Sequence, residues 1–421
     1  MVETFGYISV QPDWAVDVKK ALSGAEGPHA FWASAYKQGT ESLHDTIQIT
    51  KTDSPTSPLK LTAQSITAEY IDTRHLQLST TNSNSHPVSQ NILAPRLYTA
   101  PHRSVECSQI KRKTGLRSFD ISRYGGLLVG CGDEGAMGVY EIEGRVHRVQ
   151  LEGHLGDITA CRFFPSGQVV LSGATDMRIK IWSASDGSNP VTLVGHTAAI
   201  TDLAIIGRGR QVLSAAADGT LRLWHCGEAS VVHVFELSRM RINSVDLVAR
   251  FEAQDVFEID GKLAVAACED GRVIVVDLMA REVVAEYGDV GGVPVRAVAY
   301  DVANSRLYTG MADGSVNVWA AADAGEPVYA FRRNASPVSA IRLVYGADAG
   351  EPRICVGTED GQLFVAAVID NNGAVGVEIV EELVAFDVDP ITQIRTAPSS
   401  VKNSTRQSIW ASGRTNKAYE F

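Results

Sequence analysis

The sequence predicts an all-β protein, a seven-bladed β-propeller preceded by a small mixed N-terminal domain. Three observations lead to this fold class. Segments of about 40–45 residues repeat along the chain. Each segment contains short stretches in which apolar and polar residues alternate, as in half-buried strands. Asp-Gly pairs, which are typical of tight hairpin turns, recur in phase with these stretches.

Two of the repeats align almost without gaps. In each, the histidine of a Gly-His pair lies 28 positions before a tryptophan: His154 before Trp182, and His196 before Trp224. The turn landmark recurs at positions 133, 176, 218, 270, 313 and 360, and a last degenerate copy lies at 412–419. This pattern is similar to that of WD40 repeats, which form four strands per propeller blade. Counting the copies gives seven blades, although no Trp-Asp dipeptide occurs.

The chain ends inside the third strand of the seventh repeat, so a fourth strand is missing there. An open ring would leave an unpaired strand edge, which favours aggregation. We therefore expect residues 91–421 to form the propeller, with a strand within 91–99 completing the last blade. Residues 1–90 are expected to form the small N-terminal domain, with a helix near 15–22 and a linker near 76–90 that is rich in Ser, Thr and Asn.

Composition and charge exclude several functions. The net charge is −11, and the region after residue 100 carries 31 basic against 40 acidic residues, a field that opposes nucleic-acid binding and anionic membranes. We expect no membrane span and no signal peptide. The six cysteines are widely spaced, mostly within apolar runs, which indicates a reducing compartment, cytoplasmic and/or nuclear. No P-loop, G-x-S-x-G, H-E-x-x-H or C-x-x-C motif occurs, and no cofactor or metal is expected.

One set of residues in each intact repeat resembles a catalytic Ser-His-Asp group. The two sets are His154, Ser172, Asp176 and Trp182, and His196, Ser214, Asp218 and Trp224. The resemblance to WD40 repeats implies instead that each set is a buried hydrogen-bonded chain that fixes a loop to the inner hairpin. Catalytic machinery has no reason to recur with the repeat, whereas structural contacts do. We therefore interpret both sets as structural and predict no enzymatic activity.

The remaining candidates for function are acidic residues in the loops of one propeller face. The five residues are Asp157, Glu269, Glu359, Asp387 and Asp389. Each taken alone is most simply a solvated charge. Together, on a propeller with an excess of nine acidic residues, they indicate a docking surface for a basic partner.

A closer resemblance is carried by residues 151–227, in particular Cys161–Gly173, Ile179–Ala184, Gly207–Ser214 and Asp218–Gly227. This part of the chain resembles the proteasomal ATPase-associated factor family. The resemblance implies an assembly chaperone of the proteasome regulatory particle, which binds the C-terminal domain of a base AAA-ATPase subunit. Our hypothesis is that Asp387 and Asp389, aided by Glu359 and Glu269, pair with basic residues of that domain. We expect the protein to be a monomer by itself.

Two other functions remain open at this point. One is a substrate receptor or scaffold of a ubiquitin ligase or another multiprotein complex; the absence of a Trp-Asp pair and of a three-helix box in residues 1–90 disfavours a ligase receptor. The other is a propeller enzyme or lectin-like binder, which requires acids, histidines or metal ligands that converge in the central channel.

Overall fold

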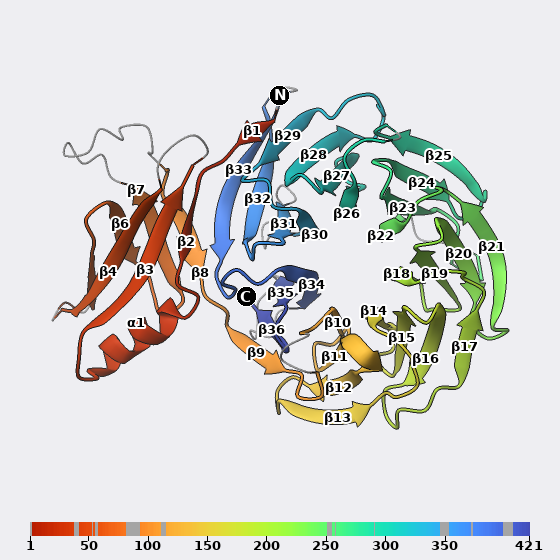
Figure 1. Cartoon of the computed structure of the whole chain (residues 1–421), viewed down its shortest axis with the longest axis horizontal. Helices are drawn as coiled ribbons and strands as arrows, with labels where there is room; N and C mark the ends of the chain where they lie inside the picture. Colours follow the sequence, from red (N-terminus) through yellow and green to blue (C-terminus); the bar gives the residue numbers. More distant parts are fainter. Residues whose placement is uncertain are drawn as a thin grey trace.

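The computed structural model describes residues 2–37, 42–52, 54, 58–80, 93–110, 115–250, 255–256, 258–289, 291–345, 353–371, 374–398 and 407–421. The predicted fold class is confirmed, since these residues form a ring of four-stranded sheets beside a smaller β domain with one helix (Figure 1). Among the described residues, no helix is long and apolar enough to cross a membrane.

Seven four-stranded blades surround a common axis within the described part of the chain (Figure 1). The first strand of each blade lies innermost, next to the first strand of the following blade, and β34 lies beside β10, so the ring is closed. Blades 1 to 3 are β10 (Ser118–Ile121), β11 (Leu127–Cys131), β12 (Met137–Glu141) and β13 (Val146–Gln150); β14 (Ile158–Phe163), β15 (Val169–Ala174), β16 (Arg178–Ser183) and β17 (Val191–Val194); β18 (Ile200–Ile206), β19 (Gln211–Ala216), β20 (Thr220–His225) and β21 (Ser230–Glu236). A 3-10 turn, η1 (Asp133–Gly135), joins β11 to β12.

The remaining blades follow the same order. Blades 4 to 7 are β22 (Ile242–Ala249), β23 (Lys262–Cys268), β24 (Val273–Asp277) and β25 (Glu282–Tyr287); β26 (Val295–Asp301), β27 (Arg306–Met311), β28 (Ser315–Ala320) and β29 (Tyr329–Arg332); β30 (Val338–Val344), β31 (Arg353–Thr358), β32 (Leu363–Asn371) and β33 (Ala374–Leu383); and β34 (Ile391–Pro398), β35 (Gln407–Gly413) and β36 (Lys417–Glu420) with β9 (Arg103–Glu106).

The apolar alternation of the repeats builds the core between neighbouring blades. In β20, for example, Leu221 and Leu223 are fully buried, whereas Thr220 and Arg222 are only half-buried. The Asp-Gly landmarks form the turns between second and third strands. Gly219 has a φ of 76°, and a Cβ atom there would lie 2.1 Å from the carbonyl oxygen of Ser238, so this turn requires glycine.

An N-terminal strand does complete blade 7, but the predicted segment was wrong. The closing strand is β9, in which Val105 lies opposite Ala418 of β36. Residues 96–99 form β8 (Arg96–Thr99) instead, which pairs in parallel with the end of β33. Both segments are short and strand-like, and Pro101, which has no N–H, separates them. Counting residues therefore predicted that an N-terminal strand closes the ring, but it did not identify which segment forms that strand.

The N-terminal domain is a two-layered structure around one core. Its first layer is the sheet β2 (Tyr7–Val10), β3 (His29–Tyr36), β4 (Leu43–Lys51) and β5 (Leu59–Thr62); the second is β6 (Ile66–Tyr70), β7 (His75–Thr80) and β8. The predicted helix is α1 (Trp14–Ser23), which ends at Gly24 with φ 75°. Trp14 and Val18 of α1 are fully buried in the core that the two layers share.

This domain is continuous with the propeller and not a separately tethered unit. The strands β6, β7 and β8 extend blade 6 into a seven-stranded sheet, β30-β31-β32-β33-β8-β7-β6. In addition, β1 (Glu3–Thr4) pairs in parallel with β29 of blade 5. The linker predicted near 76–90 is therefore wrong for residues 76–80, which belong to β7, and residues 81–90 lie outside the described residues.

Candidate docking face of the propeller

Each of the two intact repeats contains a complete buried hydrogen-bond chain. In blade 3, His196 Nδ1 lies 2.9 Å from Asp218 Oδ2 and His196 Nε2 lies 2.7 Å from Ser214 Oγ. Trp224 Nε1 donates to the same hydroxyl at 2.8 Å. Blade 2 repeats this geometry with His154, Ser172, Asp176 and Trp182, at 2.9, 2.7 and 2.7 Å. Each serine oxygen is therefore held between a histidine and a tryptophan, and both serines are fully buried.

Burial and hydrogen bonding set the charge state of these chains. Burial lowers the pKa of His196, although Asp218 opposes the shift, and the same holds for His154. The Asp218 carboxylate accepts hydrogen bonds from the Thr197 N–H, the Thr220 hydroxyl and His196, and these lower its pKa to about 2 in spite of its burial. A neutral imidazole against an ionised carboxylate is thus the form that the fold favours.

Other blades keep part of this chain with different side chains. In blade 4, Ser238 donates to Asp270 at 2.7 Å, and in blade 6, Asn334 donates to Asp360 at 2.7 Å. In blade 5, Trp319 donates to Thr309 at 3.1 Å. Blades 4 to 6, which lack the Gly-His pair, therefore keep a hydrogen bond either to the turn aspartate or between the tryptophan and a hydroxyl group.

The five predicted acidic residues all lie on one face of the ring. Asp157 precedes the first strand of blade 2, Glu269 and Glu359 lie in the turns between second and third strands, and Asp387 and Asp389 lie in the connection from β33 to β34. Backbone hydrogen bonds join these two kinds of loop: Thr175 N–H donates to Asp157 O, and Glu359 N–H donates to Pro337 O, both at 2.9 Å.

Two of the five acids are engaged within the protein. Asp157 pairs with Arg117 Nη2 at 3.1 Å and accepts the Glu134 N–H at 3.0 Å. Glu269 accepts a hydrogen bond from Asn243 at 2.7 Å and lies 3.5 Å from Arg296 Nη1. Their charges are therefore largely compensated. Sequence reasoning missed these partners because Arg117 and Arg296 lie far from them along the chain.

The other three acids form the uncompensated part of the face. Glu359 and Asp387 are exposed, Asp389 is half-buried, and no salt bridge joins any of them to a cation within the described residues. Their loops touch, since a Cβ on Gly361 would meet the carbonyl oxygens of Asp387 and Asp389 at 2.4 and 3.0 Å. Of the five predicted acids, those without an ion pair therefore lie at blades 6 and 7.

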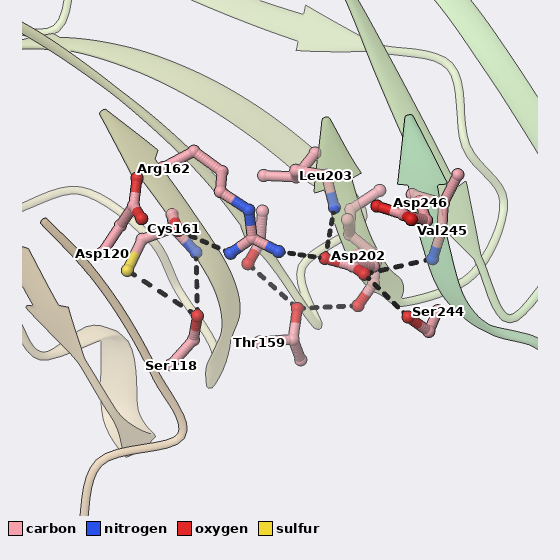
Figure 2. Close-up of polar contacts among 12 residues, drawn as sticks. Ser118, Asp120, Thr159, Cys161, Arg162, Asp202, Leu203, Ser244, Val245 and Asp246 are labelled. Carbon is pink, nitrogen blue, oxygen red and sulfur yellow. Dashed lines mark hydrogen bonds and ion pairs between the residues drawn. The ribbon is translucent and has the colours of Figure 1, made fainter. Parts of the chain in front are cut away.

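The central channel contains a charged network that sequence reasoning did not find. The first strands carry three aspartates and three arginines that pair across blades: Arg162 with Asp202 at 2.5 Å, Arg342 with Asp246 at 3.4 Å and Arg395 with Asp120 at 3.4 Å. Figure 2 shows Arg162 between the carbonyl of Cys161 and the carboxylate of Asp202.

Each of these aspartates also binds the backbone of the following blade. Asp120 accepts the Phe163 N–H at 2.7 Å, Asp202 the Val245 N–H at 3.1 Å, and Asp246 the Tyr300 N–H at 3.1 Å. Figure 2 shows Asp202 reaching Ser244 and Val245 in this way. These contacts join neighbouring blades at the axis, and the equal numbers of acids and arginines leave the network without excess charge.

A signal for this network exists in the sequence. Arg162, Asp246, Arg342 and Arg395 each occupy the fifth position of the first strand in their blade. A charged residue at one fixed strand position in four repeats predicts a shared environment, here the channel wall.

Burial and the nearby Arg162 and Arg342 lower the pKa of Arg395, and burial raises the pKa of Asp246.

The cysteines are consistent with a packing role. Burial raises the pKa of Cys226 and of Cys268 to about 12, so these thiols are protonated and unreactive at neutral pH. Among the described residues, no three His, Cys, Asp or Glu side chains are grouped so that they could hold a metal ion.

Comparison with known proteins agrees with the repeats. The family model "WD domain, G-beta repeat" matches residues 145–183, 187–225 and 286–320. A Dictyostelium discoideum protein named probable proteasomal ATPase-associated factor 1 is 28% identical over 96% of this chain and 94% of its own length. The human proteasomal ATPase-associated factor 1 is 31% identical, over 38% of this chain and 36% of its own length. The Saccharomyces cerevisiae 26S proteasome regulatory subunit RPN14 is 42% identical over 59 residues, 14% of either chain.

Proposed function

Because the chain is a WD40-repeat propeller related to the proteasomal ATPase-associated factors, we propose that it is a non-enzymatic assembly chaperone of the proteasome regulatory particle. Its partner is the C-terminal domain of a base AAA-ATPase subunit, bound through a basic surface. The names of its relatives support an association with proteasomal ATPases. The site of action is the cytoplasm, the nucleus or both, in keeping with six free cysteines.

The observation that carries this proposal is the uncompensated acidic patch of Glu359, Asp387 and Asp389. Carboxylates without a cation of their own attract a basic surface and speed its encounter with the propeller. The engaged acids Asp157 and Glu269 contribute less, since a partner would have to compete with Arg117 and Arg296 for them. The rigid ring presents the patch without rearrangement, which lowers the entropic cost of docking.

Charge reversal tests the proposal. In the double variant Asp387→Lys/Asp389→Lys, we expect binding to the C-terminal domain of the cognate base ATPase to weaken by about a hundredfold or more, because two attractive contacts become repulsive. Titration calorimetry against the C-terminal domain of each base ATPase subunit, at two salt concentrations, measures this. The control Glu143→Lys/Asp186→Lys makes the same charge change at exposed residues in the turns between third and fourth strands, on the opposite face.

The outcomes separate the candidate functions. Loss of binding in the first variant and normal binding in the control support the proposal. Normal binding of Asp387→Lys/Asp389→Lys at both salt concentrations would overturn the assignment of the patch. Recovery of cullin adaptors in place of base ATPases after affinity purification would favour the substrate-receptor alternative.

A further inference from the structure

The outer face of the N-terminal sheet is open beside the acidic patch. Phe31, Ala33 and Ala35 of β3 point into the core that β6–β8 and α1 cover. The opposite face carries the cross-strand pairs Tyr7–Tyr36 and Ser9–Ser34, and its two tyrosine rings are stacked 5.2 Å apart. Trp32 lies on this face with 38% of its surface exposed, at the edge of a hollow of about 740 Å³.

A groove of about 220 Å³ joins this face to the propeller. One wall consists of β2 and Trp32, and the other is the connection that contains Asp387 and Val388. β2 is an edge strand of its sheet, so an extended segment of another polypeptide can run alongside it. Because Asp387 belongs both to this wall and to the acidic patch, the groove is a direct continuation of the patch.

The groove carries excess negative charge. Its floor contains Arg333, which is 6% exposed and whose guanidinium binds Glu382 through both Nη atoms, one at 2.8 Å. Glu382 is shared with Arg96, whose Nη1 lies 3.3 Å from it, so the local count is two arginines against three carboxylates, those of Glu382, Asp360 and Asp387. Asp360 accepts hydrogen bonds from the neutral side chains Asn334 and Gln362, at 2.7 and 2.8 Å, and no salt bridge reaches Asp360 or Asp387 within the described residues.

The groove also exposes apolar surface. Val388 is 76% exposed next to Asp387, and Trp32 faces the same groove from the other wall. Single exposed apolar residues are common on protein surfaces. Here an indole and an aliphatic side chain flank one acidic groove, so a bound peptide can pack an apolar side chain against them and place a cation at the carboxylates.

We propose that this groove is a second contact site for the ATPase C-terminal domain. It binds a short extended segment in which a lysine or arginine, placed at Asp387 and Asp360, neighbours an apolar side chain that packs against Val388 and Trp32. The N-terminal domain thereby becomes part of the recognition surface. This inference rests on the proposed function, since the segment belongs to the partner that the acidic patch holds.

Substitutions on the two groove walls test the inference, and Trp32→Ala tests it apart from the patch because Trp32 lies on the wall without patch residues. In Val388→Lys, a cation placed beside Asp387 should repel the basic segment and weaken binding of the C-terminal domain by about tenfold or more. Trp32→Ala should weaken binding by about three- to tenfold through loss of the apolar contact. The matched control is Val194→Lys, at a valine that is 65% exposed on β17 of blade 2, and it should bind within about twofold of the unmodified protein.

A second measurement does not depend on affinity. A photo-crosslinking benzoylphenylalanine at position 32 should label a segment of the C-terminal domain that contains a lysine or arginine, as mapped by mass spectrometry. If Val388→Lys and Trp32→Ala bind normally while Asp387→Lys/Asp389→Lys does not, the groove is not a contact site and the proposed function stands. If the unmodified protein binds no base ATPase domain, both proposals are wrong.

Discussion

Single hydroxyl groups connect the buried polar chains of the propeller. Ser214 is fully buried, and its oxygen contacts both His196 and Trp224. Thr309 of blade 5 is equally buried, but within the described part of the chain its hydroxyl accepts a hydrogen bond from Trp319 alone. The two positions therefore offer a graded comparison within one molecule.

We expect Ser214→Ala to lower the free energy of unfolding by about 2–4 kcal/mol, because it leaves two buried groups without a partner. Thr309→Val should cost about 1–2 kcal/mol, since one donor is stranded and the shape is kept. Chemical denaturation of both variants measures the difference. An equal cost for the two substitutions would contradict the view that the serine connects two partners.

The roles of single residues could be predicted from the sequence where the same residues recur from one repeat to the next. The residues of the two chains recur at identical spacing, so the sequence alone indicated that they share a structural role. The partners of Asp157 and Glu269 do not recur: Arg117 precedes β10 and Arg296 lies in β26. Whether a loop carboxylate is free or paired depends on which blades become neighbours, and only the folded ring determines that.

At the scale of strands, closure of the ring depends on β9. Val105 is fully buried, and the backbone N–H of Cys107 donates to Asn416 at 2.7 Å beside this pairing. The strand has only four residues, so few hydrogen bonds connect the two ends of the propeller. The number of strands in the repeats predicted that an N-terminal strand completes blade 7. Two short segments, one on each side of Pro101, were candidates for that strand, and the sequence did not distinguish them.

Val105→Pro should open this closure, because proline removes a backbone donor and restricts φ within the strand. Hydrogen exchange should accelerate in β36 and β35, and blades 2 to 4 should retain their protection. The control Val105→Ala loses side-chain packing but keeps the backbone hydrogen bonds, and should accelerate exchange less. Uniform acceleration over all blades by Val105→Pro would mean that the ring unfolds as one cooperative unit.

At the scale of the whole molecule, the N-terminal domain and the propeller share one sheet and one buried ion network. Glu382 at the end of β33 binds Arg333 and, at 3.3 Å, Arg96 of β8. The side chain of Glu382 is 7% exposed and that of Arg333 is 3% exposed. The composition of residues 1–90 suggested a separate domain. The pairing between β8 and β33 joins residues that are far apart in the sequence, 286 positions for Arg96 and Glu382, so no local sequence pattern indicates it.

Glu382→Ala should therefore loosen the attachment of the N-terminal domain. Removing the shared carboxylate leaves two arginines without their anion, at a cost of about 3–5 kcal/mol for a buried pair. We expect calorimetry to show an added transition at lower temperature, and hydrogen exchange to increase in β2 and β6–β8 before it increases in blades 2 and 3. The control Glu382→Gln retains an acceptor oxygen and should have a smaller effect. A single transition shifted as a whole would show instead that the domain and the ring unfold together, so that the groove between them persists for as long as the propeller does.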